Sequence, residues 1–387
     1  MTPDAPRRTA ESAERSVTIA RARPEQREEL MALIDGAFRK PVAGELPHLF
    51  EPARIGNHHV AAVDGRLAAV VGVYPHGFRC RDVVFDTAGI GQVATSEDCR
   101  GLGLMSRLLA PACEEADRYD FTWLHGDQLR YGRYGWSRGG LAYAVETFDK
   151  YLPEPRRSAE IRPLDLVRDR ALIDRAVARA PQACLLPADE FSLLLKGARG
   201  RMLSGWVLGE AFLLADRDGA RIIDAEGDEA ALTELLAHAA RALRRHPGDR
   251  WKLEILCPPE PTPLLAVGRR HAWTLTVRAS ANFRIGRLAP FLRKACRLAP
   301  PPARPASGRL GLANADTGDA ATVRWDGGRF DVEEGAGADA IRLSTFDLSD
   351  LCFGLWPPDL LLPLLPPDSP VRQVLPLRLF IPHLFDK

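Results

Sequence analysis

The sequence predicts a mixed α/β (α+β) fold that is divided into several units. Its 387 residues exceed one ordinary core, because domains average roughly 150 residues. Residues 93–116 have the pattern of a strand, a glycine-containing turn and a helix with one buried face. By contrast, Asp64-Gly65 joins two apolar runs and is typical of a tight turn between antiparallel strands. We therefore expect helices packed on sheets that include antiparallel strands.

The composition indicates a globular protein whose partner is a small molecule. Apolar residues make up 46% of the chain and charged residues 27%, and 52 basic against 51 acidic residues leave a formal charge of +1. No overall field would therefore attract nucleic acid or an anionic membrane. The seven cysteines are scattered, with neither a CxxC pair nor a cysteine–histidine spacing that suits zinc. We expect no metal site and a reducing, cytoplasmic location.

Neither end of the sequence predicts a membrane segment. Residues 1–16 are charged and lack an apolar core, which favours a disordered tail over a signal peptide. The most apolar region, residues 351–367, is interrupted by Asp359 and several prolines. A membrane-spanning helix is therefore not expected there.

The elements of the first unit follow from the apolar spacing. Residues 17–22 alternate as a strand does, and the next segment places Leu30, Leu33, Ile34 and Phe38 on one helical face. The remaining elements are predicted in this order: hairpin strands at 59–63 and 67–74, a central strand at 88–94, a helix that ends near 119 with Leu102, Met105, Leu109, Ala112 and Ala116 inward, and a strand at 121–124.

The turn between the central strand and its helix contains Gly101 and Gly103. A helix start carries unpaired N–H groups and the positive end of the helix dipole, and glycine lets a ligand approach that backbone closely. Such a turn can hold a diphosphate. The same pattern also occurs where a strand and a helix pack without any ligand, so neighbouring motifs have to decide.

The order of these elements and the turn resemble the GNAT superfamily of acyl-CoA-dependent N-acyltransferases. Counted from Val93, Gly101 and Gly103 occupy the glycine positions of the pattern V-x-P-x-x-[QR]-x-x-G-x-[GA]. Thr95 stands where the pattern has proline, and Asp98 where it has glutamine or arginine. The resemblance implies acetyl-CoA as the acyl donor and backbone N–H groups near Val93 and Ala94 as the donors to its carbonyl oxygen.

The segment YGRYGW, residues 131–136, is similar to the tyrosine motif of the Eis-like (enhanced intracellular survival) branch of that superfamily. The resemblance implies that Tyr131 is the general acid and that the base is the terminal carboxylate, here that of Lys387, with Asp386 as a rival. The residues that it places at acetyl-CoA are Gln92, Val93, Ala94, Cys99, Arg100, Gly101, Leu102, Gly103, Leu104, Gly126 and Asp127.

Two other side chains are candidates for catalysis. His125, close to Asp127, could act as a base, although a histidine at a strand end is often structural. Cys99 lies at a helix start, a position that lowers the pKa of a thiol and could make it a nucleophile. We therefore keep two functions in view: an N-acetyltransferase that acts on a primary amine of a small molecule or peptide, and a catalytically silent regulatory module that binds CoA or lipid. Asp98 keeps the second open.

Two further units follow the first. A hairpin around Asp218-Gly219, a helix capped by Asp228 with Leu232, Leu235, Leu236, Ala239 and Leu243 inward, and a strand with Trp251, Leu253 and Ile255 repeat the first layout without its glycine pair. After the prolines of 300–305 come a hairpin over 321–334 and a helix near 345–353. The Eis-like resemblance implies a GNAT domain at 17–150, a second GNAT-like domain without cofactor at 151–280 and a sterol-carrier-like domain at 281–387. It also implies a homo-oligomer, since the family tends to assemble.

Overall fold

The computed structural model describes residues 15–198, 203–216, 221–243, 252–299, 307–356 and 371–382. Several expectations lie outside these ranges: most of the tail at 1–16, the turn at Asp218-Gly219, Trp251, the prolines of 300–305, Asp386 and Lys387. Within the described ranges, no helix is long and apolar enough to cross a membrane.

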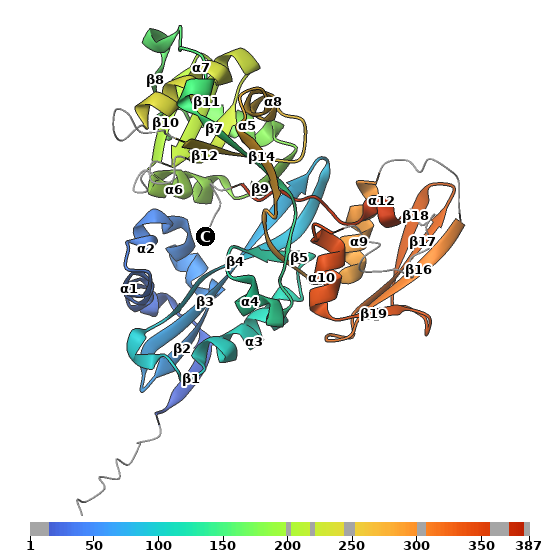
Figure 1. The fold of residues 1–387 in the computed structure, drawn as a ribbon. Coiled ribbons are helices and arrows are strands. Elements are labelled where there is room, and N and C mark those ends of the chain that lie inside the picture. Colours follow the sequence, from blue (N-terminus) through green and yellow to red (C-terminus); the bar gives the residue numbers. More distant parts are fainter. Residues whose placement is uncertain are drawn as a thin grey trace, which may run out of the picture.

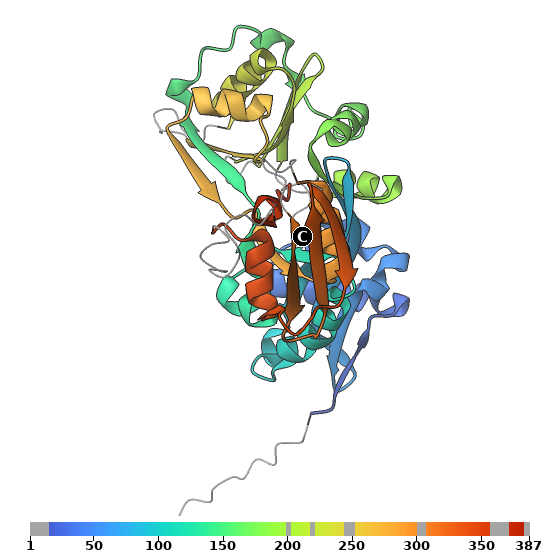
Figure 2. The ribbon, with the colours of Figure 1, turned by 90° about the vertical axis from the view of Figure 1, so that its right-hand side faces the viewer.

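Three sheets with helices packed on them build the molecule, which confirms the predicted mixed α/β fold. In Figure 1 the second sheet lies above the first, and the third lies to the right of the first. Figure 2, turned by 90°, shows the third sheet in front of the first, with the second still above them. The second and third sheets therefore flank different sides of the first.

The first sheet has eight strands of mixed direction. Along it lie β1 (Val17–Arg21), β2 (His58–Val63), β3 (Arg66–Cys80), β4 (Val83–Thr95), β5 (Phe121–Leu124), β15 (Ala281–Ile285) and β6 (Ser137–Gly139), while β9 (Gln182–Leu185) pairs with β3. The helices of this region are α1 (Arg27–Phe38), α2 (Val42–Glu45), α3 (Leu104–Ala116) and α4 (Gln128–Tyr131). Only β4 and β5 pair in parallel among its neighbouring described strands.

The predicted hairpin turn and helices of this region are confirmed, but the buried faces of α1 and α3 differ from the predicted ones. The hairpin turn has positive φ at Asp64 (52°) and Gly65 (81°), as a tight turn of this kind requires. Leu30 and Ile34 are buried, but Phe38 ends α1 and is exposed. Helix α3 begins at Leu104 instead of Leu102. Its buried face is therefore Leu104, Leu108, Leu109, Ala112 and Ala116, while Met105 is only half-buried.

The second sheet has seven strands. Its order is β14 (Thr274–Arg278), β7 (Ala142–Phe148), β13 (Lys252–Cys257), β12 (Arg221–Glu226), β11 (Ala211–Asp216), β10 (Leu203–Leu208) and β8 (Arg162–Pro163). The helices of this region are α5 (Arg170–Arg179), α6 (Ala188–Ala198), α7 (Glu229–Ala242) and α8 (Pro263–Arg270). The predicted cap is present, because Asp228 accepts a hydrogen bond of 2.7 Å from the Ala231 N–H. All five predicted core residues of this helical segment are buried.

Three strands pair across the boundaries at which the chain was expected to divide. Strand β7 lies within 17–150, yet it pairs with β13 and β14 of the second sheet. Strand β15 begins at residue 281, yet it lies between β5 and β6 of the first sheet. Strand β9 lies within 151–280, yet it pairs with β3 of the first sheet. The first and second units therefore exchange β7 and β9, and the first sheet is complete only when β15 is added.

The third sheet is small and adjoins the first through an aromatic cluster. It contains β18 (Arg329–Glu334), β17 (Ala320–Asp326), β16 (Ser307–Asn314) and β19 (Ile341–Leu343), with helices α9 (Leu288–Arg297), α10 (Thr345–Phe353) and α12 (Val371–Val374) in the same part of the chain. The predicted hairpin and helix are both confirmed. The Phe353 ring of α10 stacks on Phe283 at 5.0 Å and meets Phe121 at 5.3 Å between ring centroids. The core is thus continuous from the third unit into the first sheet.

Candidate active site

A wedge opens between β4 and β5 of the first sheet. The two strands pair in parallel only from Thr87 to Gly89 on β4, opposite Phe121 to Trp123 on β5. Strand β4 then continues to Thr95 along β3, while β5 ends at Leu124 and pairs on its other side with β15. Beyond Gly89 the two strands no longer share a ladder. Backbone groups of β4 that face this opening are therefore available to a ligand that enters it.

A β-bulge interrupts β4 where the wedge opens. The register against β3 shifts between the pairs Val70↔Ala94 and Gly72↔Gly91, so Gln92 and Val93 together fill one ladder step. Gln92 has a φ of 54°, which is uncommon for a residue other than glycine. Bulges turn backbone groups out of the regular ladder and are frequent beside active sites. That backbone near Val93 and Ala94 faces the acyl group stays a prediction, and the bulge lies at these residues.

The glycine turn continues from β4 into α3 with an open backbone. Gly101 and Gly103 have φ values of 86° and 69°, in the left-handed region that favours glycine. A Cβ built on either residue would have no atom within 4 Å. The two glycines are thus needed for backbone conformation, and the space beside them is free of other described protein atoms.

The start of α3 suits an anion. Gly103 is its N-cap, no side chain among the described residues caps it, and its first turn contains no acidic residue. The first N–H groups of a helix lack partners within the helix and carry the positive end of its dipole. A thirteen-residue helix that begins in this way beside two open glycines can bind a diphosphate through backbone alone.

Charged side chains around this turn are engaged with one another. Asp98, which stands where a glutamine or arginine was expected, accepts a hydrogen bond from the Ser96 hydroxyl, and that bond holds the pKa of Asp98 below its usual value. Glu97 pairs with Arg39 at 2.6 Å and with Arg100 at 3.6 Å. Asp98 is therefore ionised at neutral pH, while Arg100 and Arg39 bring positive charge to the same turn.

Tyr131 lies at the far side of the wedge, after the end of β5. Asp127 caps the short helix α4 by accepting a hydrogen bond of 2.9 Å from the Leu129 N–H, and α4 ends at Tyr131. The ring is 7% exposed and packs in the cluster that also contains Leu104 and Leu108 of α3. The tyrosine therefore belongs to the same hydrophobic cluster as the helix whose first turn forms the candidate anion site.

Burial keeps the Tyr131 hydroxyl protonated. Loss of solvation raises the pKa of this phenol above its ordinary value, and the charge and hydrogen bond of Arg130 offset the rise only in part. A phenol with a reference pKa of roughly 10 already carries its proton at neutral pH. Tyr131 can therefore donate a proton and does not serve as a base.

Residues from β15 hold the tyrosine segment, and the sequence did not reveal them. The Asn282 side-chain amide donates to the Gly126 carbonyl at 3.0 Å. Arg284, which is 4% exposed, donates to the Tyr134 carbonyl at 2.9 Å and pairs with Asp117 at 2.7 Å. A buried arginine in the short apolar run 281–285 was the one available signal, since a buried charge needs a partner.

The two rival catalytic residues have other roles or the wrong chemistry. His125 Nε2 donates to the Ser280 carbonyl at 2.9 Å, so this nitrogen carries a proton and ties β5 to the start of β15. Cys99 is buried, and burial together with the charge of Asp98 raises the pKa of its thiol. The thiolate needed for nucleophilic attack is therefore disfavoured, contrary to what its place near a helix start suggested.

The described residues bring most of the expected site together. Gln92, Val93 and Ala94 lie at the bulge, the turn runs from Cys99 to Leu104, and Tyr131 ends the short helix that follows β5. Leu102 is exposed, and Asp127 acts as a helix cap. Within the described residues, no group of histidine, cysteine, aspartate and glutamate side chains could hold a metal ion.

Comparison with known proteins places this site in a recognised domain. Residues 18–139 match the family model described as "Acetyltransferase (GNAT) domain". No curated protein matches the chain. Among solved structures, a GCN5-related N-acetyltransferase from Anabaena variabilis is 16% identical with a TM-score of 0.64, over 95% of this chain and 97% of that one. Another from Kribbella flavida is 15% identical with a TM-score of 0.61, over 87% and 88%.

A third structural relative is Eis1 from Mycobacterium abscessus. It is 13% identical with a TM-score of 0.58, over 88% of this chain and 90% of that one. At such identities the likeness concerns the fold alone. The coverage shows that these relatives share the arrangement of nearly the whole chain, and not only that of the first domain.

Proposed function

We propose that this chain, which carries a GNAT acetyltransferase domain at residues 18–139, transfers an acetyl group from acetyl-CoA to a primary amine of a small molecule or peptide. The main support is the uncapped start of α3 beside Gly101 and Gly103, directly after the bulged end of β4. The first N–H groups of α3 can donate to a diphosphate. The backbone at the bulged end of β4 can donate to a thioester carbonyl.

In the proposed reaction the neutral amine nitrogen attacks the thioester carbon of acetyl-CoA. Backbone N–H groups near Val93 and Ala94 stabilise the oxyanion that forms. The carbon–sulfur bond then breaks, and the departing thiolate takes the proton of the Tyr131 hydroxyl. The proton that the amine loses goes to a base, for which we propose the terminal carboxylate of Lys387, with Asp386 as the alternative. Free CoA and an N-acetyl amine are the products.

Release of free CoA tests this function. The purified chain would be incubated with acetyl-CoA and a panel of amines, and free thiol would be measured with and without each amine. Amine-dependent thiol release together with a matching N-acetyl product supports the proposal. Binding of acetyl-CoA without release for every amine would favour the alternative, a silent CoA-binding regulatory module. Asp98 at the diphosphate turn is the observation that supports that alternative.

We assign the two remaining units by the same reasoning. The second sheet and α7 repeat the strand–helix order of the first domain, and we propose a GNAT-like unit that does not bind CoA, because Asp228 caps α7 and Glu229 lies in its first turn. These carboxylates would repel a diphosphate. For the third unit, a four-stranded sheet with α9, α10 and α12 beside it, we propose a sterol-carrier-like domain.

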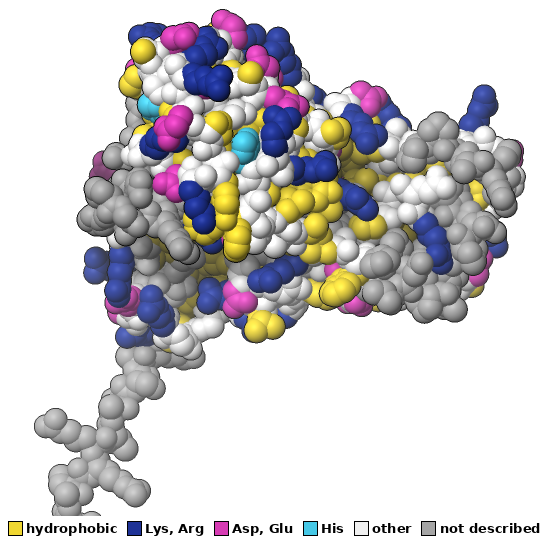
Figure 3. Space-filling view, turned by 45° about the horizontal axis from the view of Figure 1, so that its top comes forward, with side chains coloured by type: hydrophobic (Ala, Val, Ile, Leu, Met, Phe, Trp, Pro, Cys, Tyr) yellow, Lys and Arg dark blue, Asp and Glu magenta, His cyan; other side chains and the backbone are white. Residues whose placement is uncertain are grey.

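We also propose a homo-oligomer and a cytoplasmic location. On the edge strand β14 and just before it, Trp273, Leu275 and Val277 are 59%, 46% and 56% exposed and alternate along the chain. Figure 3 shows exposed hydrophobic side chains gathered between the second unit and the third. Sedimentation velocity would measure the assembly. The location rests on the seven cysteines, none of which forms a disulfide, as in proteins of a reducing compartment.

A further inference from the structure

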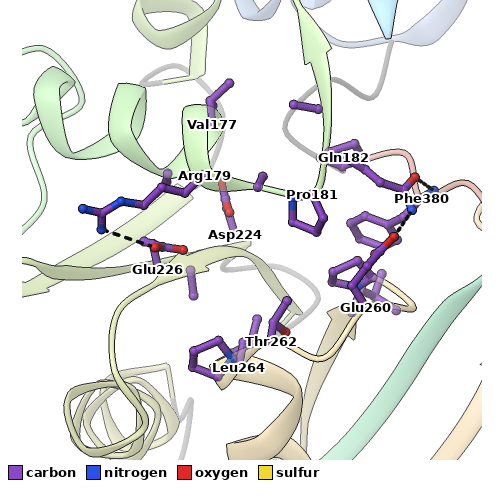
Figure 4. A pocket seen from close by; sticks show the side chains of 18 of the residues that line it. Val177, Arg179, Pro181, Gln182, Asp224, Glu226, Glu260, Thr262, Leu264 and Phe380 are labelled. Atoms are coloured by element: carbon purple, nitrogen blue, oxygen red, sulfur yellow. Dashed lines mark hydrogen bonds and ion pairs between the residues drawn. The ribbon is translucent and has the colours of Figure 1, made fainter. Parts of the chain in front are cut away.

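A cavity lies between the second unit, β9 and the C-terminal segment, away from the glycine turn. Its volume is about 390 Å³, within the range of small-molecule sites. Most of its wall is apolar, and Val177, Pro181, Leu264 and Phe380 are among the lining residues. Figure 4 shows Glu226 and Arg179 on one side of this cavity, Glu260 and Phe380 on the other, and Asp224 between them. Three carboxylates thus line a largely apolar space.

The cavity occupies a wedge like that of the first domain. Strands β12 and β13 pair in parallel only at Arg221 and Ile222, opposite Glu254 and Ile255. Beyond these pairs, the end of β12 and the segment after β13 form opposite parts of the cavity wall. Helix α7 follows β12 as α3 follows β4. In each of the first two units, the two parallel strands therefore separate after a short paired stretch: β4 from β5, and β12 from β13.

The chemistry of the second wedge is opposite to that of the first. Its turn contains Glu226, and Asp228 caps α7 with Glu229 in the first turn. Asp228 accepts from one N–H group of the helix, that of Ala231, and the three carboxylates place negative charge where the first domain has none. A diphosphate is excluded here, whereas a cation is favoured.

The carboxylates of the cavity are poorly compensated. Glu260 Oε1 accepts a hydrogen bond of 2.7 Å from Gln182, but its Oε2 is buried and has no hydrogen-bond partner among the described residues. Asp224 has no ion pair with a described basic residue, and burial raises its pKa to about 6. Glu226 lies 3.8 Å from Arg179. A buried acceptor without a partner destabilises the folded state, and more so when it is charged.

From these observations we propose that this cavity is a binding site for an organic cation, namely an amine with an apolar body. Its ammonium group donates to Glu260 Oε2 and is attracted by Asp224 and Glu226, while its hydrocarbon part packs against Pro181, Leu264 and Phe380. The ligand supplies the donor that the buried carboxylate lacks. The site is separate from the glycine turn, and it does not depend on the acetyl transfer proposed above.

The cavity also adjoins the last described residues of the chain. Gln182 donates to the Arg378 carbonyl at 3.0 Å and accepts from the Phe380 N–H at 2.8 Å, while it donates to Glu260. One side chain thus connects a proposed ligand acceptor to the C-terminal segment. Occupancy of the cavity is therefore expected to stabilise that segment.

Calorimetric titration without acetyl-CoA tests the site with a matched pair of probes. The amine 4-phenylbutylamine carries the required charge, and 4-phenyl-1-butanol has nearly the same shape without it. We expect the amine to bind at pH 7.5 at least tenfold more tightly than the alcohol. Equal affinities, or no binding of the amine, would overturn the proposal.

Variants locate the binding. Glu260→Gln keeps the oxygen that Gln182 contacts and removes the charge, so the amine affinity should fall at least tenfold while the melting temperature without ligand does not fall. Asp224→Asn should also weaken binding. Glu210→Gln, at an exposed position of the same unit, and Gly103→Val, at the glycine turn, should leave the amine affinity unchanged. Wild-type affinity in both cavity variants would place the amine elsewhere and refute the assignment.

Discussion

The ring of Tyr131 lies directly against the backbone of Gly126. A Cβ added to Gly126 would be 2.6 Å from Cε2 of that ring, closer than two carbon atoms without a bond can approach. Gly126 ends the connection from β5, and the Asn282 amide holds its carbonyl from the neighbouring strand. The backbone of Gly126 therefore cannot easily move away from the ring. The position of Tyr131, the proposed general acid, depends on the absence of a side chain at Gly126.

Gly126→Ala should displace the Tyr131 ring. We expect a loss of stability of about 1–3 kcal/mol, as for other overpacked cores, and a fall in kcat. Chemical denaturation measures the first and steady-state kinetics the second. Gly36→Ala is the control, since a Cβ there meets nothing within 4 Å. If Gly126→Ala keeps full stability and turnover, the close approach of the Tyr131 ring to Gly126 does not matter for function.

Tyr131→Phe should reduce turnover without weakening acetyl-CoA binding. The ring and its packing on Trp136, at 6.4 Å between centroids, remain, and only the proton donor is lost. Loss of a positioned general acid costs roughly a hundredfold or more in rate. We expect kcat to fall by that factor and the KM for acetyl-CoA to stay constant, which marks an interaction made in the transition state.

Tyr134→Phe is the internal control for that experiment. Its backbone carbonyl is held by Arg284, a contact that the substitution does not touch, so turnover should stay near that of the wild type. If Tyr134→Phe loses turnover while Tyr131→Phe keeps it, the general acid is Tyr134 and not Tyr131.

Gly103→Val should abolish acetyl-CoA binding and leave the fold intact. The added side chain has room, but its φ of 69° is strained for valine by about 1–2 kcal/mol, and the side chain would cover the first N–H groups of α3. Gly209→Val carries the same strain at a φ of 60° with equal room in another unit. Calorimetric titration should show loss of acetyl-CoA binding in the first variant only. Unchanged affinity in Gly103→Val would remove the diphosphate site from this turn.

Asp224→Asn should stabilise the protein at neutral pH but not in acid. Burial raises the pKa of Asp224 from 3.8 to about 6, so the folded state binds the proton more tightly than the unfolded state. The buried group therefore costs stability as pH rises from about 4 to 6, by ~3 kcal/mol at most above pH 6. The variant should unfold at higher denaturant than wild type at pH 7.5, and the difference should shrink towards pH 4. A difference that does not change with pH would contradict this.

Removal of residues 385–387 should reduce turnover much more than stability. This follows from the proposal that the terminal carboxylate is the base. Thermal unfolding and CoA release would be compared for the full and the shortened chain, with Asp386→Asn to separate the alternative base. Full activity of the shortened chain would show that the base lies elsewhere.

Local features of the chain could be read directly from its sequence. The hairpin at Asp64-Gly65, the cap at Asp228 with its apolar stripe, and the glycine turn before α3 are all present. Each depends on residues only a few positions apart, because turn dihedrals, capping and helical periodicity are set by near neighbours. The mixed α/β class followed from the same signals.

Only the tertiary structure decided which strands pair and which side chains are buried. The sequence does not show which sheet receives β7 and β15, and both pair outside the unit in which the sequence placed them. The bulge at Gln92 depends on the register against β3. Asp224 looks like a solvated carboxylate in sequence and becomes a cavity residue only because distant segments close around it. Such properties arise from contacts between residues far apart in the chain, on which local periodicity carries no information.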